Sequence, residues 1–220
     1  MNVKELLKEC AEHRQAVLAT NFYNFETLTG VMRAAQATDA PVLLQLTRSS
    51  IDYMGLHQAV SMARTAIADY GVRGWIHLDY GGSVELVERC LDAGFDSGMI
   101  DASERPFEEN VATTRRVVEL ARPYGVNVEA ELGYVAKLGQ QQGGGFTTAD
   151  EARTFVEQTG VDALAVAIGS AHGFYKQPPH LDIERLREIH AATPVALVLH
   201  GSSGIPHDMV QQAIAEGIVK

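Results

Sequence analysis

The order of apolar runs along these 220 residues predicts a parallel (β/α)8 barrel. Seven short runs rich in Val, Ile, Leu and Ala alternate with segments of helical periodicity, and the connections between them are short. Strands separated by helices indicate a parallel sheet, because parallel neighbours need a crossover connection. Seven such units favour a barrel over an open doubly wound sheet. The dinucleotide-binding pattern Gly-x-Gly-x-x-Gly is also missing after the first run.

The predicted elements follow one another in regular order. The strands are Ala16–Thr20, Val42–Leu46, Trp75–Leu78, Ser97–Ile100, Val126–Glu131, Ala163–Ile168 and Ala196–His200. The helices between them include Phe25–Ala37, Leu56–Tyr70, Val84–Ala93, Glu108–Tyr124, Ala149–Thr159 and Ile183–Ala191. Glycine follows the third, fourth and fifth of these helices, and it is a common stop signal there. The segment Met1–Lys8 predicts the start of an amphipathic helix rather than a signal peptide.

The end of the sequence predicts an incomplete barrel. The last helix, Asp208–Glu216, leads into Ile218-Val219-Lys220, which resembles the start of an eighth strand. We therefore expect residues 1–220 to form a single barrel domain that is incomplete at its C-terminus, with a longer form adding another strand and helix. Strands one and seven would then have unpaired edges, which favours low solubility or oligomers.

Composition is typical of a soluble globular enzyme. The net charge of −10 and the pI near 5.2 argue against nucleic acid or an anionic membrane surface as a partner. The two cysteines, Cys10 and Cys90, lie in helical patterns, so we expect no disulfide and a cytoplasmic location. No apolar run reaches membrane-spanning length.

Polar residues beside glycine follow three of the predicted strands. His172-Gly173 follows the sixth strand, His200-Gly201 ends the seventh, and Asp79-Tyr80-Gly81-Gly82 follows the third. Parallel barrels carry their chemistry at the C-terminal ends of the strands, and glycine lets an anion approach bare backbone N–H groups. A histidine after a strand is more often a structural hydrogen-bonding residue. The paired glycine-flanked histidines nevertheless favour one composite site.

Four segments carry a resemblance to a known family. They are Asp101–Asn110, Val128–Gly133, Ala171–Lys176 and Leu199–Pro206. Together they resemble the class II, metal-dependent ketose-bisphosphate aldolases, which act on fructose- and tagatose-bisphosphate. The resemblance implies a (β/α)8 barrel with a zinc ion on three histidines. It also implies a reaction between dihydroxyacetone phosphate and an aldehyde, a homo-oligomer, and a role in glycolysis or related carbohydrate metabolism.

The resemblance assigns roles residue by residue. His172 and His200 match two zinc ligands, and Asp79 matches the catalytic acid that moves the substrate proton. The carboxylates of Asp101 and Glu131 match groups near the metal. The expected substrate and phosphate contacts are Asn21, Gly173, Lys176, Gly201 and Ser203. The resemblance also allows a monovalent cation as a second cofactor.

One ligand position departs from the family pattern. The family has His-x-Asp-His-Gly after the third strand, whereas this chain has His77-Leu78-Asp79-Tyr80-Gly81. Tyrosine keeps its proton at neutral pH and is not a usual zinc ligand. Glu131, Asp101 or His77 would have to complete the set, and we expect any zinc to bind more weakly than at a three-histidine site.

Three functions stay open from the sequence. The first is a metal-dependent aldolase on a phosphorylated ketose, with Asp79 as acid and base and Lys176 on the phosphate. The second is a divergent, metal-free barrel lyase or isomerase on a sugar phosphate. The third is a non-catalytic relative that binds sugar phosphate. Other readings of single residues also stay open: Asp79 could cap the next helix, and Lys176 could be a solvated surface charge.

Overall fold

The computed structural model describes residues 1–133, 135, 145–173, 175 and 178–220. Within these ranges, seven strands form one parallel sheet in which spatial order equals sequence order. They are β1 (Leu18–Asn21), β2 (Val42–Leu46), β3 (Gly74–Gly81), β4 (Ser97–Ile100), β5 (Asn127–Leu132), β6 (Ala163–Val166) and β7 (Ala196–Val198). The predicted α/β barrel with parallel strands is confirmed, as an open barrel.

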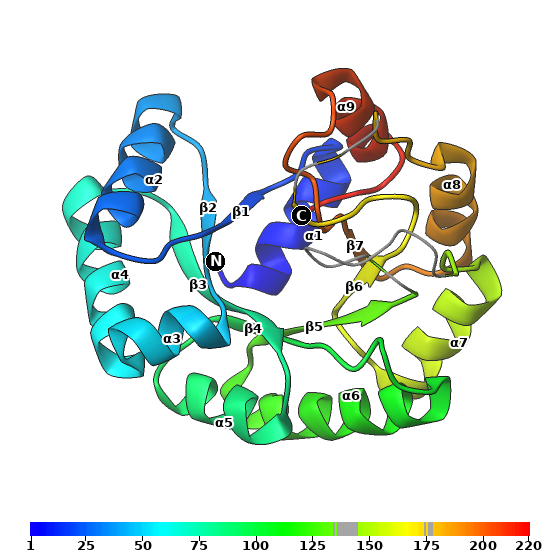
Figure 1. The fold of residues 1–220 in the computed structure, drawn as a ribbon, viewed down its shortest axis with the longest axis horizontal. Coiled ribbons are helices and arrows are strands. Elements are labelled where there is room, and N and C mark those ends of the chain that lie inside the picture. Colours follow the sequence, from blue (N-terminus) through cyan, green and yellow to red (C-terminus); the bar gives the residue numbers. More distant parts are fainter. Residues whose placement is uncertain (134, 136–144, 174, 176–177) are drawn as a thin grey trace.

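Helices α2 to α9 surround the sheet in the order of the chain, whereas α1 lies apart from this ring (Figure 1). The helices are α1 (Val3–His13), α2 (Phe25–Thr38), α3 (Arg48–Met54), α4 (Leu56–Tyr70), α5 (Val84–Asp92), α6 (Phe107–Ala121), α7 (Ala149–Thr159), α8 (Ile183–Ala192) and α9 (His207–Ala215). A 3-10 turn, Arg122–Tyr124, extends α6, so the predicted helix to Tyr124 changes its hydrogen-bonding pattern near its end. The short helix α3 was not predicted.

Helix α1 closes one end of the barrel rather than joining the outer ring (Figure 1). It begins at an Asn2 capping box, and its buried face consists of Val3, Leu6, Leu7 and Cys10. These side chains pack with inward-facing residues of several strands, including Leu43, Trp75 and Val198. A separate, larger apolar cluster fills the space between the sheet and the outer helices. Because α1 covers one end of the barrel, we expect the functional site at the opposite end, where the strands terminate.

The last three residues lie between the two ends of the sheet. Ile218 forms a parallel bridge with Leu197, and the N–H of Val219 donates to the Leu197 carbonyl at 2.9 Å. On the other side, the N–H of Val17 donates to the Val219 carbonyl at 2.9 Å. The expected start of an eighth strand is therefore present. Ile218–Lys220 thus connects the end of β7 to Val17, the residue before β1. In the described part of the chain Leu18–Asn21 pairs with β2 alone, so the expected open edge remains at β1, and Leu18 is 66% exposed.

No helix in the described part of the chain is long and apolar enough to cross a membrane. Both cysteine side chains, Cys10 and Cys90, are buried.

Candidate functional site

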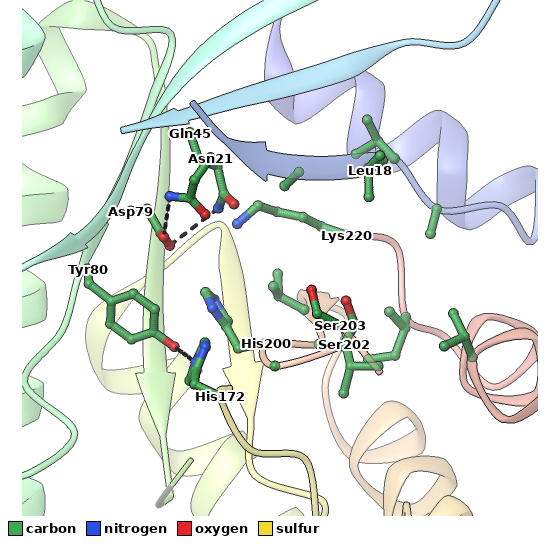
Figure 2. A pocket seen from close by; sticks show the side chains of 18 of the residues that line it. Leu18, Asn21, Gln45, Asp79, Tyr80, His172, His200, Ser202, Ser203 and Lys220 are labelled. Carbon is green, nitrogen blue, oxygen red and sulfur yellow. Dashed lines mark hydrogen bonds between the residues drawn. The ribbon is translucent and has the colours of Figure 1, made fainter. Parts of the chain in front are cut away.

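A cavity of about 530 Å³ opens where the strands end, and it gathers most of the predicted site residues (Figure 2). Seven of them line it: Asn21, Asp79, His172, Gly173, His200, Gly201 and Ser203. Asp101 and Glu131 are not among its lining residues but join it through hydrogen bonds described below. Lys176 lies outside the described residues. Three lining residues that the sequence did not single out for the site are Gln45, Ser202 and Lys220.

Two amide groups hold the carboxylate of Asp79. Nδ2 of Asn21 donates to Oδ2 at 3.0 Å, and Nε2 of Gln45 donates to Oδ1 at 3.3 Å. Both oxygens are thus fixed from the neighbouring strands β1 and β2, and the side chain is buried at the cavity wall. The alternative role of Asp79 as a helix cap is wrong, because Ser83 caps α5. Such a preorganised carboxylate suits proton transfer with a bound substrate.

A bulge in β3 brings two consecutive side chains into the site. The register between β3 and β4 shifts between Leu78 and Gly81, and Tyr80 has a left-handed backbone with φ of 52°. In a regular strand, adjacent side chains point to opposite faces, whereas a bulge redirects one of them. Figure 2 shows Asp79 and Tyr80 both directed toward the pocket. A left-handed conformation is costly for a bulky residue and is often kept at functional sites.

The hydroxyl of Tyr80 lies between a histidine and a carboxylate. It is 2.5 Å from Nε2 of His172 and 3.2 Å from Oε2 of Glu131. Burial raises the pKa of Tyr80 far above its usual value, and the charges of Glu131, Asp79 and Asp101 raise it further. The phenol therefore stays protonated, as expected from the sequence.

The two glycine-flanked histidines lie side by side and next to Tyr80. The ring centroids of His172 and His200 are 5.9 Å apart, and the Tyr80 ring is 5.2 Å and 5.0 Å from them. Nε2 of His200 is 2.8 Å from Oε1 of Glu129, which is buried inside the barrel. Burial alone would lower the pKa of His200, but the hydrogen bond to Glu129 and its charge outweigh that effect and raise the pKa.

A serine joins the two expected metal-side carboxylates. The hydroxyl of Ser103 is 2.7 Å from Oδ1 of Asp101 and 3.1 Å from Oε1 of Glu131. Burial raises the pKa of Glu131 to about 7, with a smaller contribution in the same direction from the charge of Asp101. Asn110 also donates to the Glu131 carbonyl at 3.0 Å, which fixes the end of β5. The carboxyl group of Glu131 can therefore hold or exchange a proton near neutral pH.

The expected phosphate contacts lie on two loops that a tyrosine ties together. The hydroxyl of Tyr175 accepts from the Ala171 N–H at 2.8 Å and donates to the Gly201 carbonyl at 3.0 Å. Gly201 has φ of 68°, and a Cβ there would lie 2.5 Å from the Ala171 carbonyl oxygen. Only glycine fits this close approach, and it leaves backbone at the cavity surface beside Ser203. The sequence reasoning missed Tyr175, which lies four residues after Ala171 in a segment already noted.

The family model for class II fructose-bisphosphate aldolases matches residues 1–220. This chain belongs to that family. A fructose-bisphosphate aldolase of Staphylococcus aureus (strain Mu50) is 43% identical over 228 residues, covering 100% of this chain and 79% of the relative. A probable fructose-bisphosphate aldolase of Bacillus subtilis (strain 168) is 41% identical with the same coverage.

Solved structures of this aldolase family share the fold. The YdjI aldolase from Escherichia coli K12 superimposes with a TM-score of 0.90 at 34% identity, covering 100% of this chain and 79% of that one. A putative fructose-1,6-bisphosphate aldolase from Coccidioides immitis gives 0.90 at 33% identity, covering 98% and 78%. The resemblance inferred from the four sequence segments is confirmed.

Class II aldolases depend on zinc, and a catalytic zinc site takes three protein ligands. Here His172 and His200 offer two imidazoles, but the protonated phenol of Tyr80 lies where the resemblance expects the third. Its hydroxyl is hydrogen-bonded to Nε2 of His172. Among the described residues, no group of three or more His, Cys, Asp or Glu side chains is arranged to hold a metal. These donors, as arranged, do not form the three-histidine site of the family.

Proposed function

We propose that this aldolase-family chain cleaves and forms the carbon–carbon bond of a phosphorylated ketose, yielding dihydroxyacetone phosphate and an aldehyde. The observation that carries the proposal is the Asp79 carboxylate, held by Asn21 and Gln45 at the wall of the cavity. The glycine-rich loops at Gly173 and Gly201 line the same cavity. A proton-transfer group and an anion-binding surface therefore face a common space.

The reaction requires a proton to leave a substrate hydroxyl. Asp79 would take the proton from the hydroxyl on the carbon that becomes the aldehyde. The carbon–carbon bond then breaks and its electron pair stays on the ketone half as an enediolate. The proton that Asp79 accepted then adds to the ketone-half carbon that lost its partner, which gives dihydroxyacetone phosphate. The backbone at Gly173 and Gly201 and the Ser203 hydroxyl would hold the phosphate and fix the substrate's orientation. Lys176, predicted to bind the same phosphate, lies outside the described residues.

The expected zinc requires a rearrangement of this site. We propose that any zinc binds His172 and His200, completed by Glu131 or Asp101, once the Tyr80 hydroxyl leaves His172. A monovalent cation would bind in the same region as a second cofactor. Such a zinc site would be weaker than one with three histidines, because the third imidazole is replaced.

A second candidate function is that of a divergent lyase or isomerase that acts on a sugar phosphate without a metal ion. The hydrogen bonds that join Tyr80 to His172 and Glu131 favour it, since they bring together three proton-carrying groups where the resemblance expects a metal. Metal analysis of the purified protein, together with activity before and after chelation, separates the two candidates.

Turnover of phosphorylated ketoses tests the proposal. Fructose and tagatose bisphosphates should release dihydroxyacetone phosphate, detected by a coupled dehydrogenase, whereas unphosphorylated fructose should react far more slowly. Binding without turnover for every ketose phosphate would instead indicate a non-catalytic sugar-phosphate-binding protein. We also expect a cytoplasmic homo-oligomer.

A further inference from the structure

Beneath the cavity, a string of buried polar groups crosses the barrel interior, and the proposed reaction does not use it. Nζ of Lys220 is 2.7 Å from Oε2 of Glu129 and 3.3 Å from Nε2 of His77. The other oxygen of Glu129, Oε1, is 2.8 Å from Nε2 of His200 at the cavity. All four residues are buried. Figure 2 shows Lys220 reaching from the C-terminal segment into the middle of the pocket.

The proton positions in this string follow from what each group can donate. An ammonium group has three N–H donors and no acceptor, so the Glu129 oxygen and the His77 nitrogen that face Lys220 both accept. An ammonium at 2.7 Å keeps Glu129 as a carboxylate, which only accepts. The second Glu129 oxygen therefore accepts from His200, and the hydrogen of a neutral His200 ring lies on Nε2.

The far end of the string is consistent with this assignment. Because Nε2 of His77 accepts from Lys220, its hydrogen lies on Nδ1, which is 2.8 Å from the Ser97 hydroxyl. Burial lowers the pKa of His77 well below its usual value, and the charge of Lys220 adds to the effect, so this ring is neutral. Both histidines that flank the ion pair thus have one tautomer imposed on them.

We propose that Lys220 is a positioning residue that acts through Glu129 and fixes His200 as its Nε2–H tautomer, with the lone pair on Nδ1. His200 lines the cavity, so a fixed tautomer gives the site an electron-pair donor that needs no rearrangement. The use of that lone pair in catalysis rests on the proposed function. The tautomer itself is a property of the ligand-free protein.

Glu129→Gln gives the sharpest test. Since Lys220 can only donate, the amide oxygen of the new Gln must face Lys220 and its NH₂ must face His200. Nε2 of His200 then has to accept, and the hydrogen moves to Nδ1. Nitrogen-15 NMR of protein labelled in the histidine rings should show the Nε2–H form of His200 in the wild type and the Nδ1–H form in this variant. His200→Gln identifies the His200 signals by their loss.

Variants of Lys220, the cationic partner in the ion pair with Glu129, test its role directly. Lys220→Met should turn the single His200 tautomer into a mixture, and Lys220→Arg, which keeps a donor-only cation, should restore it. Lys4→Met is the matched control, because the exposed Lys4 pairs with the half-buried Asp162 at a similar distance of 2.8 Å, away from the site. In the turnover assay, Glu129→Gln should lower kcat about 10–100-fold with little change in KM.

At a pH above the raised pKa of His200, where its ring is neutral, an Nδ1–H signal in the wild type would overturn the proposal without any variant. An unchanged Nε2–H signal in folded Glu129→Gln would also overturn it. Thermal melting of each variant shows which ones are folded. If the tautomers behave as stated while no ketose phosphate reacts, the proposed function fails and the positioning role of Lys220 stands.

Discussion

At residue 80, a phenol lies where the family resemblance expects an imidazole, and it forms hydrogen bonds across the site. Tyr80 links His172 to Glu131, and its left-handed backbone is unusual for a bulky residue. Tyr80 therefore holds the proton network of the site, and we expect the same position to set the metal affinity.

Tyr80→His should raise zinc occupancy after dialysis against a fixed zinc concentration. The change supplies a third nitrogen donor, and histidine tolerates a left-handed backbone better than tyrosine does. Tyr53→His, at an exposed position on α3, is the control that adds a histidine away from the site. Equal occupancy in wild type and Tyr80→His would mean that another residue completes the site or that the fold rejects metal.

Cys90 should be inert in the folded protein. Burial raises the pKa of its thiol to about 12, against a weaker opposing effect of Arg89. At pH 8 the thiol is therefore protonated, and the reactive thiolate is scarce. A disulfide reagent such as Ellman's should modify Cys90 only after the protein unfolds. Rapid modification under native conditions would show that α5 opens locally or that the thiol is exposed.

Sequence reasoning found the site residues that stand out from their surroundings. His172, His200 and Asp79 are polar residues beside glycine at strand exits, so pattern alone marked them. Gln45 and Glu129 were missed because each lies inside a strand, where the sequence does not reveal which interior level a side chain occupies. Both nevertheless interrupt apolar alternation on the inward face, which is the signal that could have found them.

At the level of elements, the bulge in β3 depends on Gly81. A Cβ at Gly81 would lie 2.3 Å from the Met99 carbonyl oxygen, which is backbone of the neighbouring strand and cannot move cheaply. Gly81→Ala should therefore lower the free energy of unfolding by about 1–3 kcal/mol, measured by denaturant titration. Gly82→Ala is the control, since a Cβ there meets nothing within 4 Å. Equal stability of the two variants would show that the bulge adapts.

Helix α1 covers one end of the barrel, and its packing there should contribute to the free energy of unfolding. Leu7 is 2% exposed in the cluster that closes the barrel end, whereas Leu18 is 66% exposed. Leu7→Ala should cost about 2–5 kcal/mol of unfolding free energy, and Leu18→Ala should cost almost nothing. A small effect of Leu7→Ala in thermal or urea unfolding would mean that α1 is only loosely attached.

Hydrophobic periodicity predicted the long helices and most strands well, and it missed the shortest α-helix. The bounds of β2, β4, α4 and α7 agree with the predicted ones. The helix α3 was missed because Arg48–Met54 has only seven residues, too few for a clear apolar stripe. Strand β3 runs on to Gly81 because its bulge continues the pairing with β4 beyond Leu78.

For the molecule as a whole, the weakest join lies between β7 and β1. Among the described residues, Ile218–Lys220 alone links them, through the hydrogen bonds to Leu197, Leu199 and Val17. Exposed strand edges favour association, so we expect these 220 residues to sediment as an oligomer. A monodisperse monomer with a single cooperative melting transition would show that three residues suffice to close the barrel.

Turnover by Asp79→Asn tests the assigned chemistry most directly. Asparagine keeps the shape of the side chain but cannot move a proton, so kcat for the best ketose bisphosphate should fall by about 10²–10⁴-fold. Affinity for the phosphorylated ligand, measured by calorimetry, should stay close to that of the wild type, because the residues expected to hold phosphate are unchanged. Asp52→Asn, at an exposed position on α3, should leave both quantities unaltered. Full activity in folded Asp79→Asn would contradict the role of this carboxylate in the reaction.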